Sequence, residues 1–577
     1  MTVDGLANAT AARPEGKHER PVGINFVPLV VTFIVAFLLY ALLPTKNFNY
    51  ADDSLRWAYE LTQRGNIINS HHLFLNAMRF LYQSLTGMGF NVSPVRLLAF
   101  YSAFWGATGL AFLNLLLQRA GYGQVALWAS MICGVFAGYW SYSIVGDVYS
   151  PSIALMVVGL FFSYQALVWR GDKFPWLNAV AATAAFALML VHHQAMFFFV
   201  IGTAVGLVIL RFGELRRRIQ ISALISGAVA SAALVIYAFA YRQAEMWGFS
   251  KGFVKFCAGY VDSFDARPDQ KRVGLGTLLN FLAGEARALV STNVIFRDEK
   301  FALAVQSRYP TRAVYPYPFL VAGIPVWLAI CVGIMAIAAA VIAILLVFRG
   351  IWTGFPERGL ITLICVAALP QLVFFIWWEG ISDEFCLWTL PLIAIAVGRG
   401  SAATKRPVTY LGILLATVAT STLIGSALPY WNANRDIDLV NDRFTSSLTS
   451  KDFLVGFEDI QPAARIRLAS EHQGFGYYNL AEIAGHWTDR DQAKFDEVVN
   501  SALAKGAGIR VSPRLLNPPK SGIAFMRYLN PNFDSRRQAA IEKLRGIPGV
   551  EWLKFEVFLK DYFYSDSTAS TADSSHR

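Results

Sequence analysis

Residues 24–43 read INFVPLVVTFIVAFLLYALL, and residues 44–53 continue as PTKNFNYADD. At a rise of about 1.5 Å per residue, the first stretch is long enough to cross a bilayer as a helix. It is too long for the apolar region of a signal peptide, and no small-residue cleavage site follows it. We therefore expect a retained membrane helix. The adjacent carboxylates of Asp52 and Asp53 then lie close to the membrane surface, either at a functional site or in a plain solvated loop.

The composition of the whole chain is that of a polytopic membrane protein. Of its 577 residues, 55% are hydrophobic and 15% are charged, whereas soluble proteins carry roughly 25% charged residues. The net charge of +11 does not indicate nucleic acid, because much of the excess lies in short loops where it orients a membrane protein and attracts lipid phosphates. The five cysteines include no CxxC pair, so neither a zinc site nor a disulfide framework is indicated.

The lengths of the apolar runs predict eleven membrane spans. They lie at about 24–43, 95–117, 124–144, 151–169, 175–191, 194–210, 220–241, 320–348, 359–378, 385–398 and 408–428. The expected architecture is a polytopic α-helical membrane domain at 24–428, preceded by a disordered cytoplasmic segment at 1–23. A small α/β domain at 430–565 and a disordered tail at 566–577 follow.

The basic residues predict the orientation in the membrane. With the N-terminus in the cytoplasm, the cytoplasmic connections carry Lys or Arg, whereas the short outer connections 145–150, 192–193 and 379–384 carry neither. This is the positive-inside pattern. It places the long loops 44–94 and 242–318 and the C-terminal domain outside. In a bacterium, the chain would be a multi-pass protein of the inner membrane with a periplasmic C-terminal domain.

The first outer loop contains two predicted helices. Residues 53–64 have an apolar face, and Asp52 or Asp53 can serve as the N-cap, which is a structural alternative to a catalytic role. Residues 72–85 are strongly apolar but too short to span, as expected for a helix lying in the membrane interface. The pair His71–His72 is open to two interpretations, a metal site or ordinary loop residues.

Three further outer junctions carry polar side chains. Asp147 is the only charged residue between Arg119 and Arg170, and a carboxylate at the membrane border is usually functional or paired. The other polar side chains of these junctions are His192, His193, Glu379, Asp383 and Glu384. The histidines can cap a span or bind a phosphate or sugar. The three acids, which follow two tryptophans, can form a sugar-binding rim or a solvated turn.

Several short motifs together resemble one family. They are WSYSIVGDVY at 140–149, HHQ at 192–194 and LWTLP at 387–391, set in a chain whose first membrane helix is followed by an aspartate-bearing outer loop. This pattern resembles the GT-C superfamily of membrane glycosyltransferases, and within it bacterial proteins related to protein O-mannosyltransferases. The resemblance covers about residues 24–400 and rests on architecture and short motifs, none of which is diagnostic alone.

The resemblance implies a function and a set of site residues. The donor would be a sugar on a polyprenyl phosphate at the outer leaflet, and an aspartate of the first outer loop would be the general base for the acceptor hydroxyl. Asp52 and Asp53 occupy that position, although the family often has Asp-Glu there. Asp147 matches the acid of the second outer loop, which would position the acceptor or a metal ion. A divalent cation is thus the one cofactor to consider.

The chemistry also requires a group for the leaving phosphate. A hydroxyl that attacks an anomeric carbon needs a base within hydrogen-bond reach, and the departing phosphate needs cations or N–H donors. The loop 242–318 is rich in Lys and Arg, and we expect Arg308 or Arg312, near the membrane, to bind the phosphate. The acceptor could be an envelope glycan, a lipid or a protein, and membrane lipids surround the chain.

The region after the last span is predicted to be an α/β domain. Strands are expected at 452–457, 508–512 and 551–559, with helices between them. The expected helices lie at 462–471, 491–505 and 535–545. This domain would recognise the acceptor or cover the site.

Two other functions stay open. A transporter or flippase of a lipid or glycan should carry ionisable residues within its spans and broken repeats, and the sequence shows neither. A non-catalytic scaffold of the same fold would show the same spans and loops as the enzyme.

Overall fold

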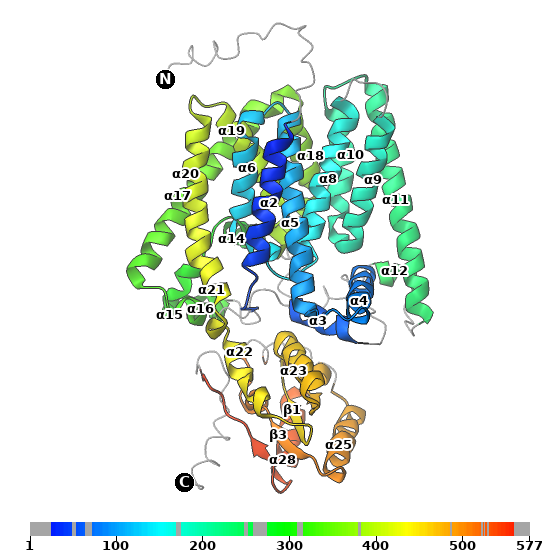
Figure 1. Ribbon diagram of the computed structural model, residues 1–577, viewed down its shortest axis with the longest axis vertical. Helices are drawn as coiled ribbons and strands as arrows, with labels where there is room; N and C mark the ends of the chain where they lie inside the picture. The colour runs from blue at the N-terminus through cyan, green and yellow to red at the C-terminus, as the bar shows by residue number, and fades with distance from the viewer. Residues whose placement is uncertain are drawn as a thin grey trace.

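The computed structural model shows a long helical bundle with a small α/β unit at one end (Figure 1). It describes residues 25–48, 53–63, 72–168, 175–246, 252–257, 274–308, 316–378, 382–484, 487–520, 523, 526–527 and 530–558. The chain is a polytopic α-helical membrane protein, as its composition predicts.

Six stretches of helix in the described part of the chain are long and apolar enough to cross a membrane. Four lie in α5 (Pro94–Arg119), α8 (Tyr149–Val168), α11 (Leu215–Met246) and α18 (Leu360–Trp378). The other two begin with α17 (Val326–Gly354) and α20 (Pro407–Thr422) and continue to Glu357 and Trp431. A seventh is the bent pair of α6 (Gly123–Val135) and α7 (Ala137–Ser143), whose axes differ by 71°. Shorter apolar helices are α2 (Phe26–Leu42), α9 (Pro175–His192), α10 (Phe197–Ile209) and α19 (Thr389–Ala402). Every predicted span coincides with one of these helices, while the count of eleven crossings stays a prediction.

The bundle is built around α8, which packs against α5 and α9 and is almost wholly buried. Outer helices such as α2 and α17 expose large apolar side chains, as lipid-facing helices do. Small residues allow close helix contacts: a Cβ added to Gly400 of α19 would lie 2.0 Å from the Leu346 carbonyl oxygen of α17.

The basic connections between the helices gather at one end of the bundle. The Arg211 N–H donates to the Arg358 carbonyl at 3.2 Å, and the Arg349 guanidinium donates to the Ala403 carbonyl at 2.5 Å. Arg399 forms an ion pair with Glu357. This end lies opposite the α/β unit (Figure 1), and the orientation of the chain in the membrane stays a prediction.

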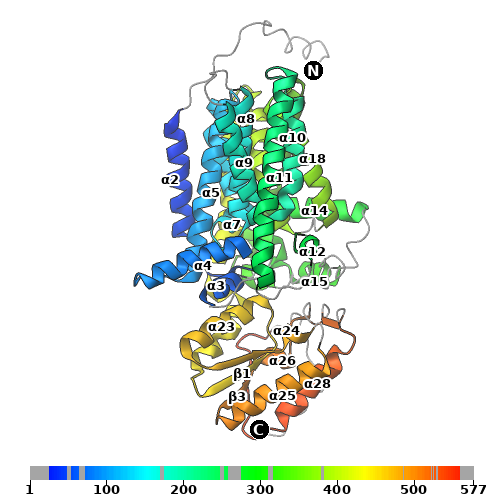
Figure 2. The same ribbon diagram turned by 90° about the vertical axis from the view of Figure 1, so that its right-hand side faces the viewer.

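Short helices cover the other end of the bundle. The first outer loop forms α3 (Ser54–Thr62) and α4 (His72–Gly87), which confirms both helices predicted for this loop. Figure 2 shows α4 lying across the ends of the long helices. The second long loop contributes α12 (Phe253–Cys257), α14 (Leu275–Leu289), η4 (Asn293–Arg297), α15 (Glu299–Arg308) and α16 (Pro316–Val321). The last two outer junctions form η2 (Gln194–Met196) and η6 (Asp383–Cys386).

The chain leaves the membrane domain through a series of short helices. They are the π-helix η7 (Leu423–Ala427), α21 (Leu428–Trp431), η8 (Ala433–Arg435), α22 (Ile437–Asn441) and η9 (Asp442–Ser447).

The α/β unit is a four-stranded parallel sheet with strand order β2-β1-β3-β4. The strands are β1 (Asp452–Gly456), β2 (Gly476–Asn479), β3 (Gly508–Val511) and β4 (Glu551–Trp552). Its helices are α23 (Ile460–Gln473), α24 (Ala481–Ala484), α25 (Asp489–Ala504), α26 (Pro513–Leu516) and α28 (Phe533–Arg545).

The three helices and the first two strands predicted for this region are confirmed. β2 was not predicted, because four residues of mixed polarity give too short an alternating pattern. The predicted strand at 551–559 was too long: within the described residues only Glu551–Trp552 pairs, with Arg510 and Val511 of β3.

Candidate functional site

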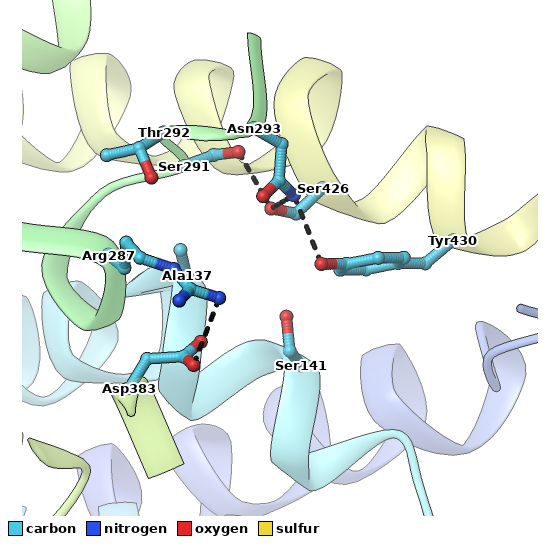
Figure 3. Close-up of a pocket in the computed structure, with 9 residues that line it drawn as sticks. All are labelled: Ala137, Ser141, Arg287, Ser291, Thr292, Asn293, Asp383, Ser426 and Tyr430. Carbon is cyan, nitrogen blue, oxygen red and sulfur yellow. Dashed lines mark hydrogen bonds and ion pairs between the residues drawn. The ribbon is translucent and has the colours of Figure 1, made fainter. Parts of the chain in front are cut away.

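A polar pocket opens toward the end of the bundle that faces the α/β unit, between helices that are far apart in the sequence (Figure 3). The lining residues are Ala137, Ser141, Arg287, Ser291, Thr292, Asn293, Asp383, Ser426 and Tyr430. One cation, one acid and six hydroxyl or amide side chains meet there, which is a suitable surface for a polar, anionic molecule.

Arg287 is the cation of this pocket. It lies in the last turn of α14, and its Nη2 is 3.3 Å from Asp383 Oδ1 and donates to the Tyr317 hydroxyl at 2.8 Å. Burial lowers the pKa of Arg287, but the charge of Asp383 and the nearby tyrosines together outweigh this and raise the pKa above its usual value. Arg287 therefore stays charged while only 27% of its side chain is exposed.

Hydroxyl and amide groups form the opposite wall of the pocket. The Asn293 amide nitrogen donates to the Tyr430 hydroxyl at 3.1 Å and to the Gly425 carbonyl at 3.1 Å. Ser426 and Ser291 are linked through their hydroxyls at 2.8 Å. Gly425 lies inside the π-helix η7, and a Cβ there would lie 2.4 Å from Ser291 Oγ. Irregular helix turns of this type are frequent at functional sites, and here the glycine lets the segment after α14 approach.

The predicted acids of two junctions converge on one tyrosine. The charges of Asp147, Asp383 and Glu384 all act on Tyr142 of α7, which also interacts with Arg287. Asp147 is buried, and its Oδ1 accepts the N–H of Val148 at 2.6 Å. The structure thus brings together Asp147, Asp383 and Glu384, which the sequence analysis selected separately.

The two histidines pack among aromatic rings near these acids. Nδ1 of His192 lies 2.8 Å from the Leu188 carbonyl oxygen and Nε2 lies 2.9 Å from the Tyr101 hydroxyl. The carbonyl can only accept, so Nδ1 carries a proton. The His193 ring lies 5.1 Å from Tyr149 and 6.2 Å from Phe385. Both histidines are buried, and the choice between a cap and a ligand for a phosphate or sugar stays a prediction.

Asp53 lies at the N-cap position of α3, but its side chain makes no capping hydrogen bond. Its carboxylate is 3.8 Å from Arg56 and 44% of the side chain is exposed. Desolvation raises the pKa of Asp53, and the Arg56 charge opposes this to a smaller extent. A carboxylate with a raised pKa is the better proton acceptor, and this one is not occupied by capping.

An apolar cluster joins the first outer loop to the junction that carries Asp147. Trp57, one turn after Asp53, belongs to the same cluster as Leu98 and Val148. The Phe74 ring of α4 lies 5.2 Å from the His192 ring. The first three outer junctions therefore meet around one core.

Several predicted residues lie outside what the structure describes. These are Asp52, His71, Glu379 and Arg312, together with the side chain of Arg308, whose backbone ends α15. Within the described residues, no group of three or more His, Cys, Asp and Glu side chains could hold a metal ion. The roles predicted for these residues stay predictions.

The sequence analysis did not single out Arg287. It is one of eleven basic residues in loop 242–318, and no motif distinguishes it from the others. A signal was available in the pattern of α14: apolar residues at Leu275, Leu278 and Leu282 mark a lipid-facing stripe, and Arg287 lies off that stripe.

No family model matches the chain, and no curated protein matches its sequence. Among solved structures, the chain is similar to an oligosaccharyltransferase from Archaeoglobus fulgidus with zinc and sulfate, at 12% identity and a TM-score of 0.47. That match covers 77% of this chain and 61% of the other, so the chain spans about three fifths of that protein's length.

Two further matches are of the same quality. ArnT from Cupriavidus metallidurans bound to undecaprenyl phosphate matches at 12% identity and a TM-score of 0.45, over 79% of this chain and 90% of the other. The archaeal oligosaccharyltransferase AglB from Archaeoglobus fulgidus, in complex with an inhibitory peptide and a dolichol-phosphate, matches at 11% identity and a TM-score of 0.45. That match covers 88% of this chain and 71% of the other. At these levels of similarity, no substrate and no residue role passes from those proteins to this chain.

Proposed function

We propose that the chain is a membrane glycosyltransferase of the GT-C type. It would move a sugar from a polyprenyl-phosphate donor to a hydroxyl acceptor at the outer face of the membrane. The observation that carries the proposal is the pocket around Arg287 and Asp383, because it combines a partly buried cation with many hydroxyl groups next to the acids of the outer junctions. The closer resemblance to O-mannosyltransferase-related proteins stays a prediction.

The proposed reaction assigns a role to each group. An acceptor hydroxyl attacks the anomeric carbon of the donor sugar, and the carboxylate of Asp53 or Asp52 takes its proton. The bond between the anomeric carbon and the phosphate oxygen breaks, and the polyprenyl phosphate leaves with the electron pair. Arg287 binds that phosphate through its planar fork of N–H donors. Asp147, Asp383 and Glu384 orient the sugar or the acceptor.

The position of the pocket at the end of the helical bundle supports a lipid-linked donor. The pocket lies among the short helices that cover the outer end of the bundle, and α14, which carries Arg287, exposes Leu275, Leu279 and Leu282. A phosphate at Arg287 would therefore sit beside surface that suits acyl or polyprenyl chains. The acceptor, which could be an envelope glycan, a lipid or a protein, would enter from the side of the α/β unit.

Substitution of the two proposed groups tests the function. We expect Asp52→Asn/Asp53→Asn to lower sugar transfer by about 10²–10⁴-fold, because the general base is lost. Arg287→Gln should lower it by roughly 10²-fold or more, and Arg287→Lys should recover part of that loss, because a charge remains without the fork. Lys300→Gln is the matched control, since Lys300 is an exposed cation of the same loop.

The readout is an analysis of envelope glycans and lipid-linked sugars in cells that lack the gene and carry each variant. Loss of one sugar from an envelope component, with the polyprenyl-phosphate sugar accumulating and no rescue by the Asp variant, supports a transferase and identifies the acceptor. An unchanged glycan profile in every strain would rule out the transferase and leave a transporter or a scaffold.

A further inference from the structure

The α/β unit and the linker that leads to it contact the first outer loop on both sides of Asp53. Before it, the Phe48 N–H donates to Asp436 Oδ2 at 3.1 Å. After it, the Thr62 hydroxyl donates to Glu471 Oε2 at 2.9 Å, and the Gln63 amide donates to the same carboxylate. These partners come from the linker after the last membrane helix and from α23, which packs along α3. Figure 2 shows α23 next to α3, between the sheet and the bundle.

The topology of the sheet explains why the contact is made here. The chain passes from β1 to β2 on one side of β1 and then crosses to β3 on the other side. In sheets of this type, a crevice opens at the carboxyl ends of the two strands where the order reverses, and ligands usually bind in it. In this unit Glu458 follows β1, and Ser512 and Arg514 follow β3.

The chain fills that crevice with its own linker. Arg514 is fully buried, and its Nη1 lies 2.5 Å from Asp442 and 2.7 Å from Glu458, while Nη2 lies 2.9 Å from Asp438. Asp438 and Asp442 belong to α22 and η9, which lead out of the membrane domain. Carboxylates of the linker thus occupy the place that a ligand would take.

A second arginine extends this network to the outer loop. Arg465 of α23 lies 2.8 Å from Asp442 and 3.3 Å from Asp436, and Asp436 is the residue that accepts the Phe48 N–H. Contacts therefore run without a break from the edge of the sheet to the segment before Asp53. Buried ion pairs add little net stability, but they hold their members in one geometry, and removal of one partner is costly.

We propose that the α/β unit positions the first outer loop for the transfer reaction, with Asp436, Arg465 and Glu471 as positioning residues. This rests on the proposed function, in which an aspartate of this loop is the base. The unit and the linker fix the positions of α3 and of Phe48 relative to the membrane domain. The linker fills the crevice of the sheet, so no ligand binds there.

Glu471→Ala provides the test least exposed to misfolding, because Glu471 lies on the surface of α23. We expect faster amide hydrogen exchange in α3 with unchanged exchange in β1 and β3. The kcat for sugar transfer should fall by between about tenfold and a hundredfold, because small displacements of a reacting group have effects of this size. The KM for the donor should stay the same, since Arg287 is untouched.

Two more variants complete the experiment. Asp436→Asn keeps the shape and an acceptor for the Phe48 N–H but loses the charge facing Arg465, so it should lower kcat less than Asp436→Ala. Asp534→Ala removes an exposed ion pair with Arg527 elsewhere in the same unit and should change neither exchange in α3 nor kcat.

The proposal is wrong if Glu471→Ala leaves exchange in α3 unchanged, or if exchange rises while kcat stays at the wild-type value. A loss of donor affinity in place of kcat would also contradict it. Failure of the proposed function looks different: the wild-type chain would then show no transfer, while hydrogen exchange would still report whether the unit holds α3.

Discussion

At the scale of single residues, Glu285 shows how burial decides a protonation state. The Thr389 hydroxyl lies 2.8 Å from Glu285 Oε2 and 2.7 Å from the Cys386 carbonyl oxygen. A hydroxyl has one proton, so it can donate to only one of these acceptors. If it donates to the carbonyl, the proton of the other hydrogen bond must come from Glu285. Burial raises the pKa of Glu285 to about 8, although hydrogen bonds with the side chains of Thr389 and Cys386 lower it in part. The side chain is therefore mostly neutral at pH 7.

Replacement of Glu285 tests this state. Glu285→Gln should leave stability nearly unchanged, because the amide can donate to Thr389 as the protonated acid does. Glu285→Ala should cost about 1–3 kcal/mol through the lost hydrogen bond and the space left behind. Unfolding temperatures of the purified protein in detergent would measure both. Equal losses for the two variants would contradict a neutral Glu285.

The same residue predicts a dependence on pH. The folded protein releases the proton of Glu285 around pH 8, whereas an unfolded Glu releases it near pH 4.5. The contribution of Glu285 to stability is therefore complete below about pH 4.5 and declines as the pH rises to about 8. Wild type should lose more stability than Glu285→Gln between pH 5.5 and 8.5. Parallel pH curves for the two proteins would contradict the assignment.

At the scale of elements, the bend between α6 and α7 separates what hydropathy can predict from what it cannot. The run 124–144 is continuously apolar and was predicted as one span, and that count stays a prediction. The chain nevertheless turns by 71° at Phe136, whose extended backbone has φ −56° and ψ 137°. No proline marks the bend. After the bend, α7 contacts α14 and η6, which are distant in sequence. The periodicity of a local stretch of sequence does not predict such contacts.

Gly138 is the residue that lets α7 meet α14. A Cβ at this position would lie 3.1 Å from the Ala288 Cα and 2.5 Å from a Leu387 methyl group. Gly138→Ala should therefore push apart the two helices that carry Ser141 and Arg287, at a cost of about 1–3 kcal/mol. Gly227→Ala in α11, where a Cβ meets nothing within 4 Å, should cost nothing.

The measurement is the unfolding temperature and sugar transfer of both glycine variants. We expect Gly138→Ala to lower both, because the pocket around Arg287 opens. A Gly138→Ala protein as stable and active as Gly227→Ala would show that the contact between α7 and α14 is not needed to form the site.

At the scale of the whole molecule, the sequence predicted the arrangement of the parts better than the identity of the site. Span positions and the helices of the first outer loop followed from hydropathy and charge. Asp147, Asp383 and Glu384 were each selected from the sequence, but their approach to one another was not. Arg287 lies off the apolar stripe of α14, but that pattern does not say which basic residue of the loop meets Asp383, because only the fold turns Arg287 toward that acid. The contact of Glu471 with Thr62 joins residues 409 positions apart, and no local pattern reports such a pair.

The placement of the two ends of the bundle predicts a topology that can be measured. The connections rich in arginine lie at the end opposite the α/β unit (Figure 1), and such connections stay in the cytoplasm. A reporter fused after residue 430 should therefore be active outside, while reporters fused after Arg119 or Arg211 should be active in the cytoplasm. A cytoplasmic reporter after residue 430 would place the pocket, Asp53 and the α/β unit on the wrong side for a donor at the outer leaflet. In that case both the predicted topology and the proposed reaction would be wrong, whereas the contacts described within the fold would still hold.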